Sequence, residues 1–225
     1  ISMLEQKFEK SRFTRVDSDV IDRLIAKEEH KEANLESNQR EILSSVFRSQ
    51  LPQIKKVEFN VETQALGENG APIMITQSEY MRRMKEMANI QAGMSFYGEM
   101  PNMYNLVLNA DHKLVKQVLT DADNSCKAAL EPIESEMASL NNRRKELQKA
   151  QEGKKTEDIP QAEKDELNDI EKKISDETTK KQAVLGEYAN GNKIIHQLID
   201  LALLQNNMLK GEALTNFVKR SIELI

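Results

Sequence analysis

The chain has 225 residues, of which 39% are hydrophobic, 31% are charged and 4% are aromatic, and its formal net charge is −5. Both signs of charge are interspersed, which argues against a nucleic-acid binder and against attraction to an anionic membrane. The single cysteine, Cys126, excludes an internal disulfide, and no apolar run reaches the length of a membrane span, so we expect a cytoplasmic protein. The chain begins at Ile1 within a charged, periodic stretch, which we interpret as part of a fragment of a larger protein.

The first 36 residues form the first predicted unit. Residues 13–16 read as a short strand that runs into a capped helix at 20–25. Residues 26–38 are almost wholly polar and indicate a linker or a solvated helix. We therefore place a domain boundary near residue 36.

The second predicted unit, residues 37–120, combines helices with a small, mainly antiparallel sheet. Helical spacing from Ile42 to Leu51 ends at Pro52. Residues 57–62 and 71–75 flank turn residues and predict a hairpin, with a third strand at 104–108. Asn109 and Asp111 are the predicted caps of the helix that follows. The predicted fold class is α+β.

Residues 121–187 differ in composition, because they contain no aromatic residue and are densely charged. Apolar residues from Leu130 to Leu147 follow a heptad spacing, and a weaker repeat follows a break at 153–160. This pattern predicts a long antiparallel coiled-coil hairpin inserted into the chain.

The last unit, residues 188–225, returns to a strong apolar period in two helices separated by Gly211. Two short helices with such wide apolar faces do not cover each other fully, so either the sheet unit or a second copy covers the remainder. The pattern favours a homodimer with a four-helix bundle. The candidate interface residues are Ile194, Leu198, Leu201, Ala202, Leu204, Leu214, Phe217, Val218 and Ile222.

Seven of the ten methionines lie between Met74 and Met103, and several fall on one stripe of a predicted helix at 77–91. This stripe either packs on the sheet as core or stays partly exposed. Because methionine is flexible and polarizable, an exposed stripe suits contact with many apolar surfaces. The candidate contact residues are Tyr80, Met81, Met84, Met87, Met94 and Phe96.

No catalytic, metal-binding or cofactor-binding motif is visible in the sequence. His30, His112 and His196 are far apart, and no glycine-rich phosphate loop or activated nucleophile motif is present. We therefore predict that this chain is not an enzyme by itself and holds no metal or cofactor.

Two segments resemble a known family. Residues 100–115 read Met-Pro-Asn-Met-Tyr-Asn-Leu-Val-Leu-Asn-Ala-Asp-His-Lys-Leu-Val, and residues 198–204 read Leu-Ile-Asp-Leu-Ala-Leu-Leu, followed by Phe-Val-Lys-Arg at 217–220. They resemble the C-terminal domain of the ninety-kilodalton heat-shock chaperones, most closely the bacterial members of the Bacteroides type. The resemblance covers about residues 13–119 and 189–225.

This resemblance implies a stress-response chaperone that binds ATP with Mg²⁺ and hydrolyses it in domains that this chain lacks. It further implies that residues 1–36 end the middle domain, that the last helices hold a permanent homodimer, and that the helix near 78–91 contacts unfolded client proteins. The hairpin at 121–187 departs from the family pattern, and its role is open. The alternative is a structural coiled-coil scaffold or adaptor in which that hairpin is the functional part.

Overall fold

The computed structural model describes Lys7, residues 35–77, 82–85, Met87, and residues 101–153 and 159–223. Its described elements are α3 (Ser37–Ser49), β1 (Val57–Gln64), β2 (Ile73–Thr76), β3 (Asn102–Asn109), α6 (Lys113–Gln151), α7 (Gln161–Gly191), α8 (Lys193–Gln205) and α9 (Glu212–Glu223). The predicted α+β class is confirmed. The predicted strand at 13–16 and helix at 20–25 lie outside the described residues.

Helix α3 begins with a capping box. The backbone N–H of Glu36 donates to Gln39 Oε1 at 3.0 Å, and the Glu36 side chain accepts from the backbone N–H of Gln39. One face of the helix, carrying Ile42, Val46 and Phe47, is buried. The helix ends before Pro52, as predicted, because proline cannot continue it.

The three-stranded sheet is mixed, with the order β1-β3-β2. Strand β1 runs parallel to β3, and β2 runs antiparallel to β3. The predicted hairpin between residues 57–62 and 71–75 is therefore wrong, and so is the mainly antiparallel sheet. Strand β3 carries the longest uninterrupted run of buried residues in the described sheet, from Leu106 to Asn109, which is typical of a strand at the centre of a sheet.

The turn between β1 and β2 is fastened by the two residues that the sequence predicts as helix caps. Asn109 Oδ1 accepts from the N–H of Leu66 at 3.1 Å, and Asp111 Oδ2 accepts from the N–H of Gly67 at 2.9 Å. The cap of α6 is instead His112, whose Nδ1 accepts from the N–H of Leu114 at 3.2 Å. The predicted caps are thus corrected, because both side chains bind a loop that is distant in sequence.

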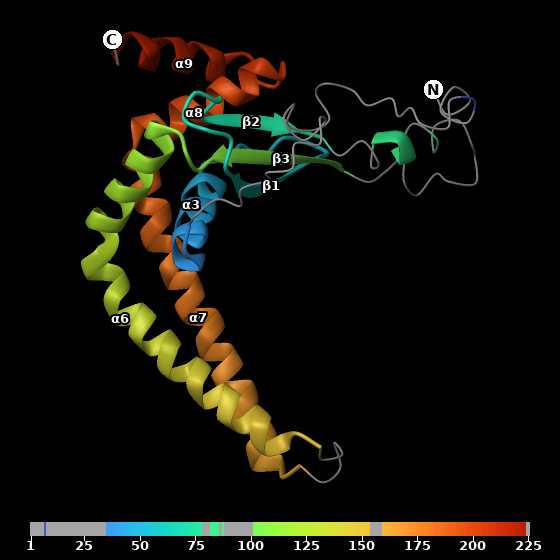
Figure 1. Ribbon diagram of the computed structural model, residues 1–225, viewed down its shortest axis with the longest axis vertical. Coiled ribbons are helices and arrows are strands. Elements are labelled where there is room, and N and C mark those ends of the chain that lie inside the picture. Colours follow the sequence, from blue (N-terminus) through green and yellow to red (C-terminus); the bar gives the residue numbers. More distant parts are fainter. Residues whose placement is uncertain are drawn as a thin grey trace.

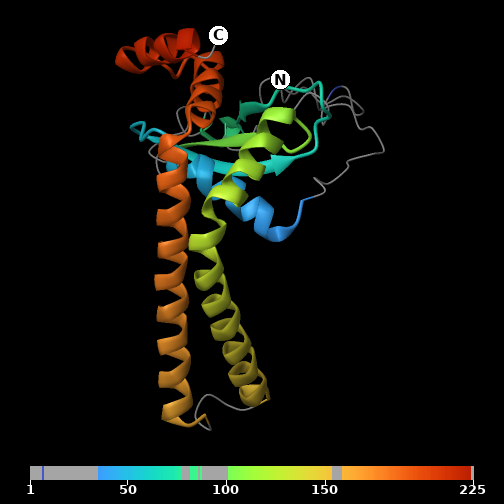
Figure 2. The ribbon, with the colours of Figure 1, turned by 90° about the vertical axis from the view of Figure 1, so that its left-hand side faces the viewer.

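Helices α6 and α7 are long, antiparallel and side by side, and they project away from the sheet (Figures 1 and 2). Both continue through predicted unit boundaries, α6 through 120/121 and α7 through 187/188. The part beyond Glu134 and Lys181, residues 135–153 and 159–180, is called the arm below. Coiled-coil packing within the arm stays a prediction.

The main core lies between one face of the sheet and the helices. It combines Leu106 and Leu108 of β3 with buried side chains of α3, the first part of α6, the last part of α7, and α8. A second, smaller cluster inside the arm contains Leu140, Leu147 and Ile170. Within the described part of the chain, no helix is both long and apolar enough to cross a membrane.

Candidate interaction surface

Helix α8 is anchored in the main core of its own chain. Asn192 caps it, because its Oδ1 accepts from the N–H groups of Ile194 and Ile195 at 3.0 and 3.2 Å. Two predicted interface residues, Leu198 and Ala202, are 4% and 0% exposed and belong to this core. They are therefore packed inside the single chain and support the surface from within.

Helix α9 lies on α8 mainly through polar contacts. Gln197 Nε2 donates to Ser221 Oγ at 2.6 Å, and Lys193 Nζ pairs with Glu223 Oε2 at 2.7 Å. The guanidinium of Arg220 donates to the Asp200 carboxylate. Phe217, another predicted interface residue, is half-buried against the main core. Polar side chains therefore take up much of the face that α9 turns toward α8.

The apolar face of α9 is left exposed. Leu214, Val218 and Ile222 are 36%, 48% and 70% exposed, and no residue of α9 is buried. Their spacing of four residues places them on one side of the helix, and we call them the α9 stripe. An amphipathic surface helix normally turns its apolar side to the core. The α9 stripe is thus an apolar surface that the described part of its own chain does not cover.

The remaining predicted interface residues belong to α8. Leu204 is 37% exposed, whereas Ile194 and Leu201 are half-buried. Helices α8 and α9 lie at the opposite end of the molecule from the C-terminal end of α6 and the N-terminal end of α7 (Figure 1). The exposed apolar residues of this end are therefore far from the end of the arm.

The two carboxylates between α8 and α9 differ in electrostatic environment. Burial raises the pKa of Asp200, an effect that the nearby Arg220 guanidinium partly opposes. The hydrogen bond and charge of Lys193 lower the pKa of Glu223, which lies at the surface. Burial therefore disfavours the charged form of Asp200, whereas Lys193 stabilises the charged form of Glu223.

The second predicted surface, the methionine-rich helix, falls partly on described residues. Residues 82–85 and Met87 are helical, Met84 is half-buried, and Met87 is 46% exposed. Lys85 Nζ donates to Asn102 Oδ1 at 2.7 Å and so joins this helix to the start of β3. The other predicted contact residues, Tyr80, Met81, Met94 and Phe96, lie outside the described residues.

Met103, which the sequence analysis did not select, is 42% exposed and adjoins Asn102. It alternates with half-buried neighbours on β3, and the cluster of methionines between positions 74 and 103 was the signal that could have included it. We add Met103 to the candidate methionine surface.

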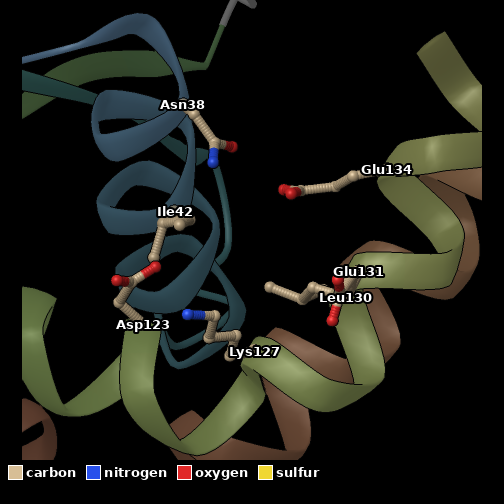
Figure 3. Close-up of a pocket in the computed structure, with 7 residues that line it drawn as sticks. All are labelled: Asn38, Ile42, Asp123, Lys127, Leu130, Glu131 and Glu134. Carbon is tan, nitrogen blue, oxygen red and sulfur yellow. The ribbon is translucent and has the colours of Figure 1, made fainter.

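A pocket of about 230 Å³ lies between α3 and α6 (Figure 3). Asn38 and Ile42 line it from α3, and α6 contributes the other lining residues: Asp123, Lys127, Leu130, Glu131 and Glu134. No group of histidine, cysteine and carboxylate side chains among the described residues could hold a metal ion.

Comparison with known proteins gives matches along the whole chain. A protein from Bacteroides fragilis named "Chaperone protein HtpG" is 68% identical over all 225 residues, and one of the same name from Bacteroides thetaiotaomicron is 67% identical. The chain belongs to the HtpG family. The predicted assignment, a C-terminal fragment of a Bacteroides-type member, is confirmed.

More distant HtpG proteins match equally completely. The HtpG of Porphyromonas gingivalis is 45% identical over 227 aligned residues that include all of this chain. In each case the chain spans 33% of the length of the HtpG relative. No family model matches the chain, and no solved structure matches it.

Proposed function

We propose that this chain is the dimerisation and client-contact region of an ATP-dependent molecular chaperone that assists protein folding. The proposal is supported by similarity along the whole of this chain to one third of the length of proteins named as chaperones. The observation that carries the dimerisation role is the exposed α9 stripe, on a helix that is held to its own chain by its polar side.

A second copy of the chain is the occupant that fits the α9 stripe best. Two copies related by a two-fold axis present the same apolar residues to each other, so one surface serves both partners. A stable interface covers about 800 Å² of each partner, which is more than one stripe of three side chains supplies. The exposed Leu204 and half-buried Leu201 of α8 supply further apolar area, which suits a four-helix bundle.

Client contact is assigned to the methionine surface. Met87 and Met103 are among the few large apolar side chains exposed in the described part of the chain, and Met84 is half-buried. Flexible methionine side chains adapt to different apolar segments, as a chaperone requires for varied unfolded proteins. ATP and Mg²⁺ would bind in parts of the whole protein that this chain does not span, so we expect no ATP hydrolysis by the chain alone.

Substitution of the α9 stripe tests the dimerisation role. In Val218→Glu, each of the two partners would bury one carboxylate in the shared interface, so association becomes unfavourable. We expect the dissociation constant to rise at least about tenfold, which is about 1.4 kcal/mol. Sedimentation velocity over a concentration series measures this change.

The matched control is Asn216→Glu, which adds the same charge at an exposed position of α9 outside the stripe. We expect this variant to associate like the unaltered chain. Equal association of all three proteins would contradict a dimer through α9. The rival function, a scaffold in which the hairpin at 121–187 is the functional part, predicts instead that dimerisation survives Val218→Glu.

A further inference from the structure

Lys181 of α7 is a buried charge at the junction of three helices. Its side chain is 5% exposed, and its Nζ lies 3.0 Å from Glu41 Oε2 and 3.2 Å from Glu134 Oε1. The same Nζ donates to Asn38 Oδ1 at 3.0 Å. Lysine is rarely so buried unless it is paired, and here α3 supplies an amide and a carboxylate while α6 supplies a second carboxylate. We call these four residues the Lys181 joint.

The Lys181 joint separates the two hydrophobic clusters of the molecule. Along α7, Leu185 belongs to the main core, whereas Ile174 and Ile170 belong to the cluster inside the arm. Lys181 lies between them on the side that faces the other helices, where an apolar residue would continue the packing. A polar residue buried at such a position restricts which partners and which register are compatible, at some cost in stability.

A second contact connects α3 and α7, about one turn of α7 closer to the sheet. Gln50 Nε2, beyond the C-terminal end of α3, donates to the backbone oxygen of Gly186 at 3.3 Å. Asn38 and Glu41 hold the other end of α3 through Lys181. Because the two attachments lie at opposite ends of α3, together they restrict rotation of α3 against α7.

The neighbouring contact between α3 and α6 is open by comparison. The pocket between these helices is lined by Asn38 of α3 and Glu134 of α6, which are both members of the Lys181 joint (Figure 3). Close packing of apolar side chains therefore does not fill this side. The ammonium group of Lys181 is what links α3 to Glu134 there.

We propose that the Lys181 joint fixes the direction of the arm, so that the arm and α3 move as one rigid body. If the joint is removed, we expect the arm to bend at the level of Lys181, between the main core and the smaller cluster inside the arm. With the joint intact, the arm acts as an extension of α3 rather than as an independently mobile attachment. This inference goes beyond the proposed function, because neither dimerisation nor client contact assigns a role to the hairpin.

Pulsed electron spin resonance on the full 225-residue chain tests the proposal. Spin labels at Arg48→Cys on α3 and Lys149→Cys in the arm, in a Cys126→Ala background, report the distance from α3 to the arm. Labelled chain is diluted with unlabelled chain, so that only pairs within one molecule contribute. We expect one narrow distance distribution, which Lys181→Met broadens and shifts.

The matched control is Lys180→Met, the same substitution at the adjacent position, where the side chain is 62% exposed and pairs with Glu177. We expect this variant to keep the narrow distribution. The proposal is overturned if Lys181→Met keeps it as well, or if the unaltered chain already shows a broad one.

Circular dichroism establishes whether Lys181→Met is folded. Should it lose helix content, Glu41→Gln and Glu134→Gln decide the question, because those side chains are 48% and 38% exposed and water can reach them. Each of these variants removes one carboxylate charge from the joint and is expected to broaden the distribution. An unchanged distribution in both would overturn the proposal.

Discussion

At the scale of single residues, the contact between α8 and α9 depends on two carboxylates in unlike surroundings. Burial raises the pKa of Asp200, so its folded state binds a proton more tightly than its unfolded state does. The stability that Asp200 contributes is therefore present below its ordinary pKa and is lost as pH rises through the raised value. Glu223, whose pKa Lys193 lowers, contributes above its ordinary pKa and loses that contribution as pH falls.

A titration of side-chain carboxyl signals by nuclear magnetic resonance checks this opposition. We expect the Asp200 midpoint to lie above 3.8, its ordinary value, and the Glu223 midpoint to lie below 4.5. The Asp200 midpoint should disappear in Asp200→Asn, which serves to assign the signal. A midpoint for Asp200 below its ordinary value would mean that the attraction of Arg220 outweighs the cost of burial.

Some single-residue roles follow from local sequence and others do not. The break in helical structure at Pro52 was predictable, because proline acts on its own backbone. The roles of Asn109 and Asp111 were not, because their side chains bind backbone groups more than 40 positions away, at Leu66 and Gly67. Lys181 was equally inaccessible, since its partner Glu41 is 140 positions distant.

At the scale of elements, apolar periodicity located the helices and strands better than it paired them. Strands β1 and β2 follow each other in sequence, which favours a hairpin, yet β3 lies between them. The uninterrupted apolar run from Leu106 to Leu108 was the available sign of a central strand in the sequence. The topology of the sheet depends on this competition for the centre, which local patterns do not express.

The methionine helix gives a prediction at the same scale. Replacing Met84 and Met87 together with serine removes flexible apolar contact area, so binding of a permanently unfolded test protein should weaken. Fluorescence anisotropy of the labelled test protein measures this binding. Met137→Ser, at a half-buried methionine of α6, is the control and should bind normally.

The stability of the same double variant distinguishes surface from core. Deleting a buried methionine side chain typically costs about 2–5 kcal/mol, and we expect a smaller loss in urea unfolding because Met87 is 46% exposed. A larger loss of stability would identify these methionine side chains as part of the core. Unchanged binding of the test protein by a folded variant would contradict the client-contact role.

At the scale of the whole molecule, the chain combines a small α+β core, which includes α8, with two features at its surface, the arm and helix α9 (Figures 1 and 2). The family was predictable from residues 100–115 and from the last helices, because a resemblance of sequence motifs does not require the topology of the sheet to be known. The apolar face of α8 was predictable as well. It was not predictable that the core of the same chain would cover α8 and leave the apolar face of α9 exposed. Periodicity identifies an apolar face without saying whether the same chain or a partner covers it.

This arrangement places α8 in the core of its own chain and leaves α9 with an uncovered apolar face. Ile195, Ile199 and Leu203 of α8 are 0–2% exposed, whereas the α9 stripe reaches 70% exposure at Ile222. A helix pair built in this way keeps its position without a partner. It also keeps an apolar surface for one, which is the central claim about this chain.

The molar mass of the unaltered chain in solution tests that claim most directly. Sedimentation equilibrium at micromolar concentration should give twice 25.7 kDa, the mass of one chain, with dissociation only on strong dilution. A mass of 25.7 kDa across the whole concentration range would contradict self-association through the α9 stripe.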